Sequence, residues 1–420
     1  MIHASLVTHT EQLLKEVLQF AHPADSVVSR YFRLNHALGH RDRGIIAEAV
    51  FVVLRQKLEF AHFAQSTSGP IERRLTLLGL CYVAGIPAVV ERVGPAEAQW
   101  LEHIKTIDRK TLPWEMRCNL PDWIRERLEK RFEKDEIEGL ANALNRSAPL
   151  DLRVNTTKMT RDDALEVLRV EGIVAEPTPY SPDGIRIEDK PALNRLKIFN
   201  DGAIEVQDEG SQLLSRLLAP KRGELVIDFC AGAGGKTLAL GALMRSTGRL
   251  YALDVSAKRL ANFKPRLARS GLSNVHPMLI DSERDPRLKR FLGKANRVLV
   301  DAPCSGLGTL RRNPDLKWRQ TPETVGELVV AQNSILRSAA RLVAPGGRLV
   351  YGTCSMLDEE NQAVVAGFLA ETPEFERQSA AAVLASQDIS GVGGENLELW
   401  PHRHGTDGFF GVVLTRRLPA

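Results

Sequence analysis

The stretch Asp228-Phe-Cys-Ala-Gly-Ala-Gly-Gly-Lys-Thr237 is the strongest indication of the fold class, because it lies between an apolar run typical of a strand and a helix-forming segment. Its glycines let the backbone approach a ligand closely, and the N-terminus of the following helix favours electronegative groups. A Walker A loop would need glycine where Cys230 stands, and a dinucleotide fingerprint would need glycine in place of Thr237. The stretch therefore predicts a nucleotide-type site of a different kind.

Two further carboxylates support a nucleoside ligand at this edge of the expected sheet. Asp254 ends the next strand, 20 residues after Gly234, which is the usual position of a carboxylate that accepts both ribose hydroxyls. Asp281 ends the strand after that, where a side chain can meet an adenine edge. The glycine-rich stretch with these carboxylates resembles the cofactor site of class I methyltransferases, which bind S-adenosylmethionine (SAM). The alternative, that Asp254 and Asp281 only cap helices, stays open.

Strand-like and helix-like segments alternate from about residue 203 onward. This alternation predicts βαβ units and a largely parallel, doubly wound, Rossmann-like α/β sheet. The expected strands are Leu225–Phe229, Leu250–Leu253, Val275–Ile280, Arg297–Val300, Leu349–Tyr351 and Phe409–Leu414.

The chain before this sheet has two regions with different sequence patterns. Residues 1 to about 115 show only helical periodicity, as in the face formed by Ile46, Val50 and Val53, which predicts a compact helical bundle. A charged connector follows, and Leu150–Val154 with short β-like runs at 172–176 and 185–188 indicates a small α+β unit. We expect an all-α domain over 1–145, a linking α+β subdomain over 146–205 and the α/β catalytic domain over 206–420.

Two cysteines follow expected strands at the edge where open α/β sheets bind ligands. They lie in Asp301-Ala-Pro-Cys304 and in Thr353-Cys354. Carbon C5 of cytosine attacks a methyl donor only after a nucleophile has added to C6, and a thiolate is such a nucleophile. A proton source near N3 of the base is also needed, and Asp301 can supply it. The competing interpretation is that each cysteine is a small core residue, the usual role of a buried thiol.

These features together resemble the RsmB/NOP/NSUN family of RNA (cytosine-5)-methyltransferases over nearly the whole chain. Beside the cofactor and cysteine motifs, the elements that carry the resemblance are Arg153-Val-Asn155, Val206-Gln-Asp208 and Asp407-Gly-Phe-Phe410. The resemblance implies that Cys354 is the nucleophile, that Cys304 is needed for product release and that Asp301 contacts the base and the donor. The bacterial members that act on small-subunit rRNA are the most similar, which implies 16S rRNA as the substrate.

The resemblance also implies a set of SAM-binding residues. These are Cys230, Ala231, Gly232, Ala233, Gly234, Gly235, Lys236, Asp254, Asp281 and Asp301. Cys230 is expected to pack at the strand end with its backbone near SAM and to have no catalytic role. The family usually has alanine and proline where this chain has Gly232 and Ala233, and losing the proline loosens the loop without removing a hydrogen-bond donor.

DNA cytosine-5 methyltransferases use the same chemistry with a different arrangement of motifs. They place the nucleophile in a Pro-Cys motif and carry a Glu-Asn-Val motif. This chain has Thr353-Cys354, and its nearest candidate, Glu360-Asn361-Gln362, does not match. The comparison favours RNA over DNA.

Basic residues follow the Pro-Cys loop directly. Arg311, Arg312, Lys317 and Arg319 surround Trp318, which suits phosphate contacts and base stacking, although a solvated charged loop is the alternative. The resemblance implies that the N-terminal helices form a NusB-like RNA-binding domain. Its 19 Lys and Arg balance 19 Asp and Glu over residues 1–145, so bulk charge does not indicate RNA there. His402 and His404 lack further ligands nearby, and no metal is expected.

Composition sets the remaining limits. The 420 residues are 43% hydrophobic and 26% charged, which excludes wholesale disorder. No apolar run approaches the ~20 residues of a membrane span, and no signal peptide is evident, so a cytoplasmic protein without membrane partners is expected. Five cysteines, an odd number, fit a reducing compartment. The net charge of +4 is too small to identify a nucleic-acid partner, and the family resemblance implies a monomer.

The sequence therefore predicts SAM-dependent methylation of cytosine C5 in RNA through a covalent bond between Cys354 and C6. Two alternatives stay open: an RNA-binding ribosome-assembly factor whose methylation is incidental, and a tRNA cytosine-5 methyltransferase. The intact pair of Cys304 and Cys354 argues against the first, because a binding protein does not need two thiols at those strand ends.

Overall fold

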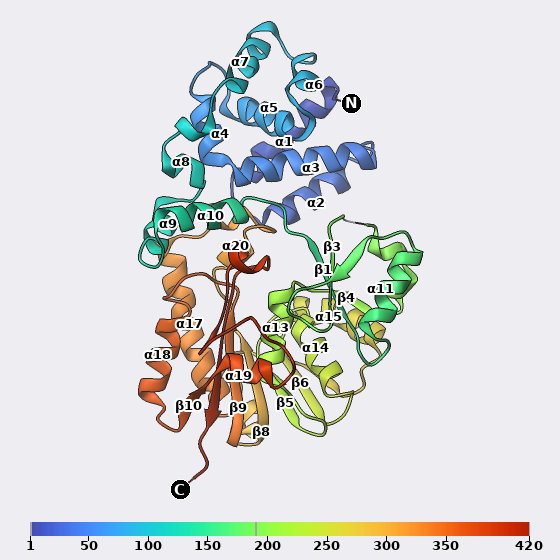
Figure 1. Ribbon diagram of the computed structural model, residues 1–420, viewed down its shortest axis with the longest axis vertical. Coiled ribbons are helices and arrows are strands. Elements are labelled where there is room, and N and C mark those ends of the chain that lie inside the picture. The colour runs from blue at the N-terminus through green and yellow to red at the C-terminus, as the bar shows by residue number, and fades with distance from the viewer. Residues whose placement is uncertain (1, 190, 420) are drawn as a thin grey trace. The chain divides into compact units, whose positions relative to one another are not determined.

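The computed structural model describes residues 2–189 and 191–419 (Figure 1). Contacts divide the chain into two compact units. The helical unit comprises residues 1–147 together with 309–322, and the sheet unit comprises residues 148–308 together with 323–420. In the part of the chain described, no helix has both the length and the apolar character needed to cross a bilayer.

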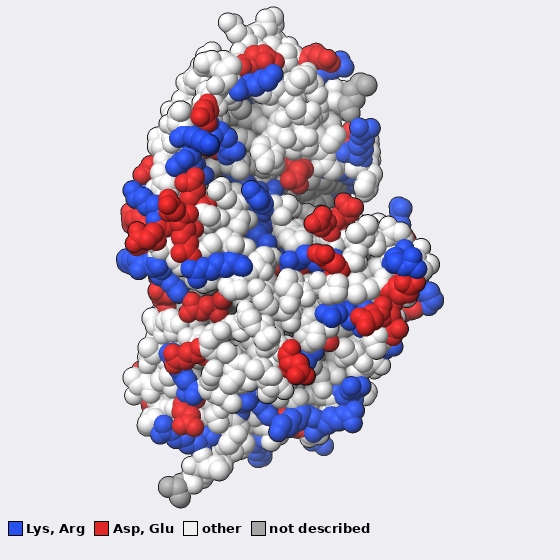
Figure 2. All heavy atoms as spheres, in the orientation of Figure 1, with Lys and Arg blue, Asp and Glu red and all other residues white. Residues whose placement is uncertain are grey.

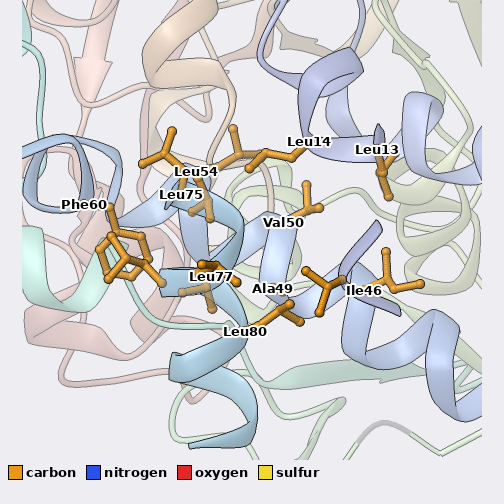
Figure 3. Close-up of a cluster of buried hydrophobic side chains, with 14 of the residues drawn as sticks. Leu13, Leu14, Ile46, Ala49, Val50, Leu54, Phe60, Leu75, Leu77 and Leu80 are labelled. Atoms are coloured by element: carbon orange, nitrogen blue, oxygen red, sulfur yellow. The ribbon is translucent and has the colours of Figure 1, made fainter. Parts of the chain in front are cut away.

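The helical unit packs its helices around one apolar core, as the sequence periodicity predicts. Leu14, Val50 and Leu77 come from three different helices and are fully buried in this core (Figure 3). Gly79 allows two of these helices to pack closely, since a Cβ there would lie 2.7 Å from the carbonyl oxygen of Ala49. The helices are α1 (Ala4–Val17), α2 (Ala24–Leu34), α3 (His40–Arg55), α4 (Lys57–Ala64), α5 (Ile71–Ala84), α6 (Ile86–Val90), α7 (Pro95–Lys105), α8 (Trp114–Cys118), α9 (Asp122–Leu128), α10 (Lys134–Leu144) and α16 (Leu316–Arg319).

The sheet unit begins with a small antiparallel sheet of order β2-β3-β1-β4, which is the α+β part that the sequence predicts. Its strands are β1 (Leu150–Val154), β2 (Ala175–Pro177), β3 (Gly184–Ile187) and β4 (Ile204–Val206). Helix α11 (Arg161–Val170) follows its N-cap residue Thr160, whose hydroxyl accepts from the Asp163 amide in a capping box. Leu152, Leu168 and Ile185 fill the core between this helix and the sheet.

The larger sheet has the order β10-β12-β9-β8-β5-β6-β7, with β11 paired to β12. Strands β9, β8, β5, β6 and β7 run parallel, whereas β12 is antiparallel to β9. Chain order reverses direction at β5, which lies between β6 and β8, and this switch point is where ligands bind in open α/β sheets. The strands are β5 (Leu225–Asp228), β6 (Arg249–Asp254), β7 (Val275–Leu279), β8 (Ala295–Asp301), β9 (Val343–Thr353), β10 (Phe375–Gln378), β11 (Leu397–Leu399) and β12 (Phe409–Arg416).

Helices cover both faces of this sheet, which confirms the predicted doubly wound architecture (Figure 1). Alternate strand residues face opposite cores: Val226 packs with the helices of one face, and the next residue, Ile227, packs with those of the other. The first face carries α13 (Glu209–Leu218), α14 (Gly235–Leu243), α15 (Ala257–Ser270) and α19 (Ala380–Ala385), and the second carries α17 (Pro322–Ala340) and α18 (Gln362–Glu371). Two short helices, α12 (Lys197–Asn200) and α20 (Pro401–His404), complete the unit.

Candidate active site

The glycine-rich stretch forms the loop between β5 and α14, as predicted. Gly232 and Gly234 have φ of 58° and 82°, in the left-handed region that glycine adopts without steric cost. A Cβ on Gly234 would lie 1.9 Å from the buried ring of Phe263, so this position has no room for a side chain. A Cβ on Gly232 would meet nothing within 4 Å, so the loop offers an open backbone surface at that point.

Asp254 ties this loop to the end of β6. Its Oδ2 accepts from the Gly232 amide at 2.8 Å, and its Oδ1 accepts from the Ser256 amide at 2.7 Å. A carboxylate can accept about four hydrogen bonds, so the oxygens retain acceptor capacity for ligand hydroxyls. Asp281 lies two residues beyond β7, and its side chain is 86% exposed. Because β5, β6 and β7 are neighbours, the structure brings the predicted strand-end carboxylates to one edge.

Asp228, the last residue of β5, lies beneath the loop and is almost completely buried. Its Oδ2 accepts from the Thr237 hydroxyl at 2.6 Å, while its Oδ1 has no hydrogen-bond partner. Burial raises the pKa of Asp228 to about 7, and the charge of Asp301 adds to this effect. Cys230 packs against the neighbouring apolar core, and burial raises the pKa of its thiol, as suits a packing residue.

The two predicted cysteines meet at the ends of β8 and β9. Asp301 pairs with Gly352 in the parallel register, so the loops that follow these strands start side by side. The Sγ atoms of Cys304 and Cys354 lie 3.4 Å apart, and both residues are half-buried. Contact with Cys354, reinforced by burial, raises the pKa of the Cys304 thiol well above its usual range. One base placed against this pair would contact both sulfurs.

Lys236 joins the glycine-rich loop to the cysteine loops. Its Nζ donates to Asp301 Oδ2 at 2.6 Å and lies 5.5 Å from the centre of the Phe409 ring. Burial alone would lower the pKa of Lys236, but the charge and hydrogen bond of Asp301 outweigh burial and raise it. The ammonium group therefore stays charged. It also interacts electrostatically with Cys354.

Two of the other elements that carried the family resemblance support this cluster, one in β1 and one in the segment before β12. Arg153 is buried and its Nη1 donates to the carbonyl oxygen of Gly235 at 2.9 Å, so β1 holds the start of α14. The Gly308 amide donates to the carbonyl oxygen of Cys354 at 2.8 Å, and the Gly408 amide donates to that of Gly308 at 2.8 Å. The segment before β12 therefore fixes the backbone of the Cys354 loop.

Sequence reasoning missed a buried polar group behind the cysteines. Glu360 accepts from the Ser305 amide at 2.8 Å and from Gln332 Nε2 at 3.0 Å. In the sequence, Glu360 stands out only because Glu360-Asn361-Gln362 does not match the Glu-Asn-Val motif. No local signal marks Glu360, because a glutamate in a loop is ordinarily solvated.

The predicted RNA contacts after the Pro-Cys loop lie in residues 309–322, within the helical unit. The expectation for Lys317 is wrong, because its side chain is 1% exposed and cannot reach a phosphate. Its Nζ donates to the carbonyl oxygens of Arg55 and Asn119 at 2.9 and 2.7 Å and to Asn145 Oδ1 at 2.8 Å. Trp318 packs against the core of the helical unit, its Nε1 donates to the Leu54 carbonyl oxygen, and the Lys57 ammonium lies 4.6 Å from the centre of its ring.

The other basic residues of this segment differ in exposure. Arg311 is also buried, whereas Arg312 and Arg319 are half-buried and stay predicted RNA contacts, as does the NusB-like character of the helical unit. Basic and acidic side chains are intermixed over the face shown in Figure 2.

Within the described residues, no group of His, Cys, Asp and Glu could hold a metal ion. The Nδ1 atom of His404 accepts a hydrogen bond from the Trp400 amide.

Comparisons with known proteins agree with this geometry. A family described as 16S rRNA methyltransferase RsmB/F matches residues 215–415, and the ferredoxin-like domain of RsmF/B-like methyltransferases matches residues 120–194. The chain is 32% identical to a probable ribosomal RNA small subunit methyltransferase B from Synechocystis, over 89% of this chain and 91% of that protein. It is 35% identical to ribosomal RNA small subunit methyltransferase B from Photorhabdus laumondii, over 71% and 66%.

A solved structure shows the same fold. A methyltransferase homologue from Pyrococcus horikoshii superimposes with a TM-score of 0.62 at 26% identity, over 74% of this chain and all of that one. The fold, the motifs and the full-length relative lead to one conclusion: the chain belongs to the RsmB/NOP/NSUN family of RNA methyltransferases, and within it to the RsmB/F group.

Proposed function

We propose that the protein transfers a methyl group from SAM to C5 of a cytosine in RNA, with 16S rRNA as the substrate. The observation that carries the proposal is the 3.4 Å separation of the Cys304 and Cys354 sulfurs at adjacent strand ends, beside the charged Lys236. Such a pair suits a reaction in which one thiol bonds to the base while the other acts on the adjacent carbon.

The residues of the glycine-rich loop fit SAM. The backbone at Gly232 is open, α14 begins at Gly235, and Asp254 keeps acceptor capacity for ribose hydroxyls. Asp281 is exposed at the same edge, where it can accept from an adenine amino group. When bound, SAM supplies an electrophilic methyl group.

The chain's own residues would then act in order. The Cys354 thiolate bonds to C6 of cytosine, and the electron pair of the C5–C6 bond becomes available at C5, which takes the methyl group. Asp301, which accepts a hydrogen bond from Lys236, would orient the N3 side of the base. Cys304 removes the proton from C5, the C5–C6 double bond re-forms, and the bond between Cys354 and C6 breaks.

The acid–base state of Cys304 suits this order. Its pKa is raised chiefly by contact with Cys354. Once Cys354 is bonded to C6, its sulfur can no longer carry a negative charge. The electrostatic contribution of Cys354 to the raised pKa of Cys304 is then removed at the stage when Cys304 has to act as a base.

The test is transfer of labelled methyl from SAM to protein-free, unmodified small-subunit rRNA, followed by nucleoside analysis. We expect label in 5-methylcytidine with the wild-type protein, no transfer with Cys354→Ala, and a covalent protein–RNA adduct with Cys304→Ala. An adduct with Cys354→Ala instead would reverse the two roles. Absence of label from rRNA but transfer to tRNA would change the substrate, and absence from both would favour the assembly-factor alternative.

A further inference from the structure

Glu360 is a completely buried carboxyl group that contacts both cysteine loops. Its Oε1 accepts from the Ser305 amide at 2.8 Å and from Gln332 Nε2 at 3.0 Å. Its Oε2 accepts from the Ser305 hydroxyl at 2.5 Å and from the Ser355 hydroxyl. Ser305 directly follows Cys304, and Ser355 directly follows Cys354. One carboxyl group therefore connects the residues that follow the two thiols.

The surrounding bonds extend this link to both sides of Cys304. Gln332 Nε2, which donates to Glu360, also donates to the carbonyl oxygen of Pro303 at 2.9 Å. The Tyr351 hydroxyl donates to the backbone carbonyl of Glu360 at 2.6 Å, which fixes the backbone that carries this carboxyl. The residues before and after Cys304 are thus held by one network anchored on α17 and β9.

Burial of a carboxyl group costs free energy, because the group loses its hydration. Apolar residues of the same volume often give equal or greater stability, whereas a satisfied polar network holds a specific arrangement. Here both carboxyl oxygens receive two hydrogen bonds each, and all four come from the loops of the two cysteines or from α17. The network is therefore suited to fixing one loop against the other.

We propose that Glu360 is a positioning residue that sets the register of Cys304 against Cys354. The inference rests on the proposed function, in which Cys304 must reach C5 of a base already bonded to Cys354. Attack by Cys354 uses Asp301 and Lys236 but does not need the Cys304 thiol. Release also needs Cys304 at a fixed position relative to Cys354, so release is the step that depends on the link.

Glu360→Ala removes the acceptor for the Ser305 amide and both hydroxyls. We expect methylation turnover to fall about 10-fold to 100-fold, because small misplacements of a reacting group cost that much. SAM affinity should stay unchanged, and a denaturant-stable protein–RNA adduct should accumulate during turnover. Glu360→Gln keeps an acceptor for the Ser305 amide and Gln332 and can donate to the hydroxyls, so it should restore release.

Asn361→Ala is the matched control. Asn361 is also buried, but among the described residues its side-chain hydrogen bonds go to the Cys354 loop alone: it accepts from the Thr353 hydroxyl at 2.5 Å and donates to the Ser355 carbonyl oxygen at 3.0 Å. Its loss should slow turnover without accumulation of adduct. Ser305→Ala, which removes one hydroxyl from the Cys304 side, gives a milder version of Glu360→Ala and serves if the larger change prevents folding.

Adduct formation decides between the outcomes. The inference is overturned if Glu360→Ala and Ser305→Ala lose activity only in proportion to their folded fraction and without adduct, or if Asn361→Ala accumulates as much adduct as they do. These results would leave the proposed function intact as long as Cys304→Ala forms the adduct. If Cys304→Ala forms none, the proposed covalent mechanism fails, and the role of Glu360 fails with it.

Discussion

At the scale of single residues, Asp228 links the stability of the sheet unit to pH. The pKa of the carboxyl group is near 3.8 in the unfolded chain, whereas burial raises the pKa of Asp228 in the folded protein to about 7. Between these values the folded protein holds a proton that the unfolded chain has released. The contribution of Asp228 to stability is therefore complete below pH 3.8 and is lost as the pH rises through about 7.

Asp228→Asn should remove this dependence, because an amide carries no charge at any pH and still accepts from Thr237. At pH 8 we expect the free energy of unfolding of the variant to exceed that of the wild type by about 2 kcal/mol, the usual cost of an uncompensated buried polar group. At pH 5 this difference in stability should be smaller. Thermal unfolding at the two pH values measures it. Asp285→Asn is the opposite control, since a hydrogen bond from Arg287 lowers the pKa of Asp285, and this variant should lose stability equally at pH 5 and pH 8.

Residue chemistry explains which site residues the sequence could identify. Cys304, Cys354 and the strand-end carboxylates were predictable because their motifs follow apolar strands, and the sheet topology then brings them to one edge. The roles of Glu360 and Lys317 were not predictable, because both roles depend on burial in the folded protein. A glutamate or lysine in a loop is ordinarily solvated, and only packing shows that these two are enclosed by hydrogen-bond partners.

At the scale of elements, the loop between β5 and α14 contains two glycines, Gly232 and Gly234. Both have a left-handed backbone conformation, but their surroundings differ. Gly232→Ala should cost about 1 kcal/mol for left-handed backbone alone. Gly234→Ala adds a clash with Phe263, and overpacking of this kind costs about 1–3 kcal/mol more. Urea unfolding of both variants measures the difference. Equal losses would mean that Phe263 moves aside without cost.

Long apolar elements were predictable from sequence, and short edge elements were not. The predicted strand Leu225–Phe229 corresponds to β5, and Phe409–Leu414 corresponds to β12, because both alternate between two buried faces. Strand β10, with the sequence Phe-Glu-Arg-Gln, is an edge strand with one buried apolar residue, so its sequence carries no alternating signal. Strand β4 has only three residues and is identified by its pairing with β1.

At the scale of the whole molecule, the chain completes the helical unit with a segment that follows the Cys304 loop. Residues 309–322 enter this unit, and Lys317 holds them there through the backbone of Arg55 and Asn119 and the side chain of Asn145. Burial lowers the pKa of Lys317 well below its usual range. Nothing in the local sequence marks residues 309 and 322 as boundaries, because the pattern of basic residues around an aromatic ring is equally typical of an RNA-binding loop.

Lys317→Met should destabilise the helical unit by about 2–3 kcal/mol, since it leaves three buried oxygens without a donor. RNA affinity measured against salt concentration should keep its slope in this variant. Arg312→Gln, from the same segment, should instead reduce the slope by about 0.7, the value for one lost phosphate contact on a single strand. A reduced slope with Lys317→Met would show that this side chain reaches RNA.

The inserted segment also has a consequence for synthesis. Proteins commonly fold their N-terminal domain first as they leave the ribosome, at about 5–20 residues per second. Here the helical unit lacks residues 309–322 until about 175 further residues have been made, a delay on the order of 10 s or more. During that interval the nascent helices expose the oxygens that Lys317 will later bind. The order of translation therefore makes the first unit to emerge dependent on a late part of the chain, and a fragment cut after residue 147 would never be complete.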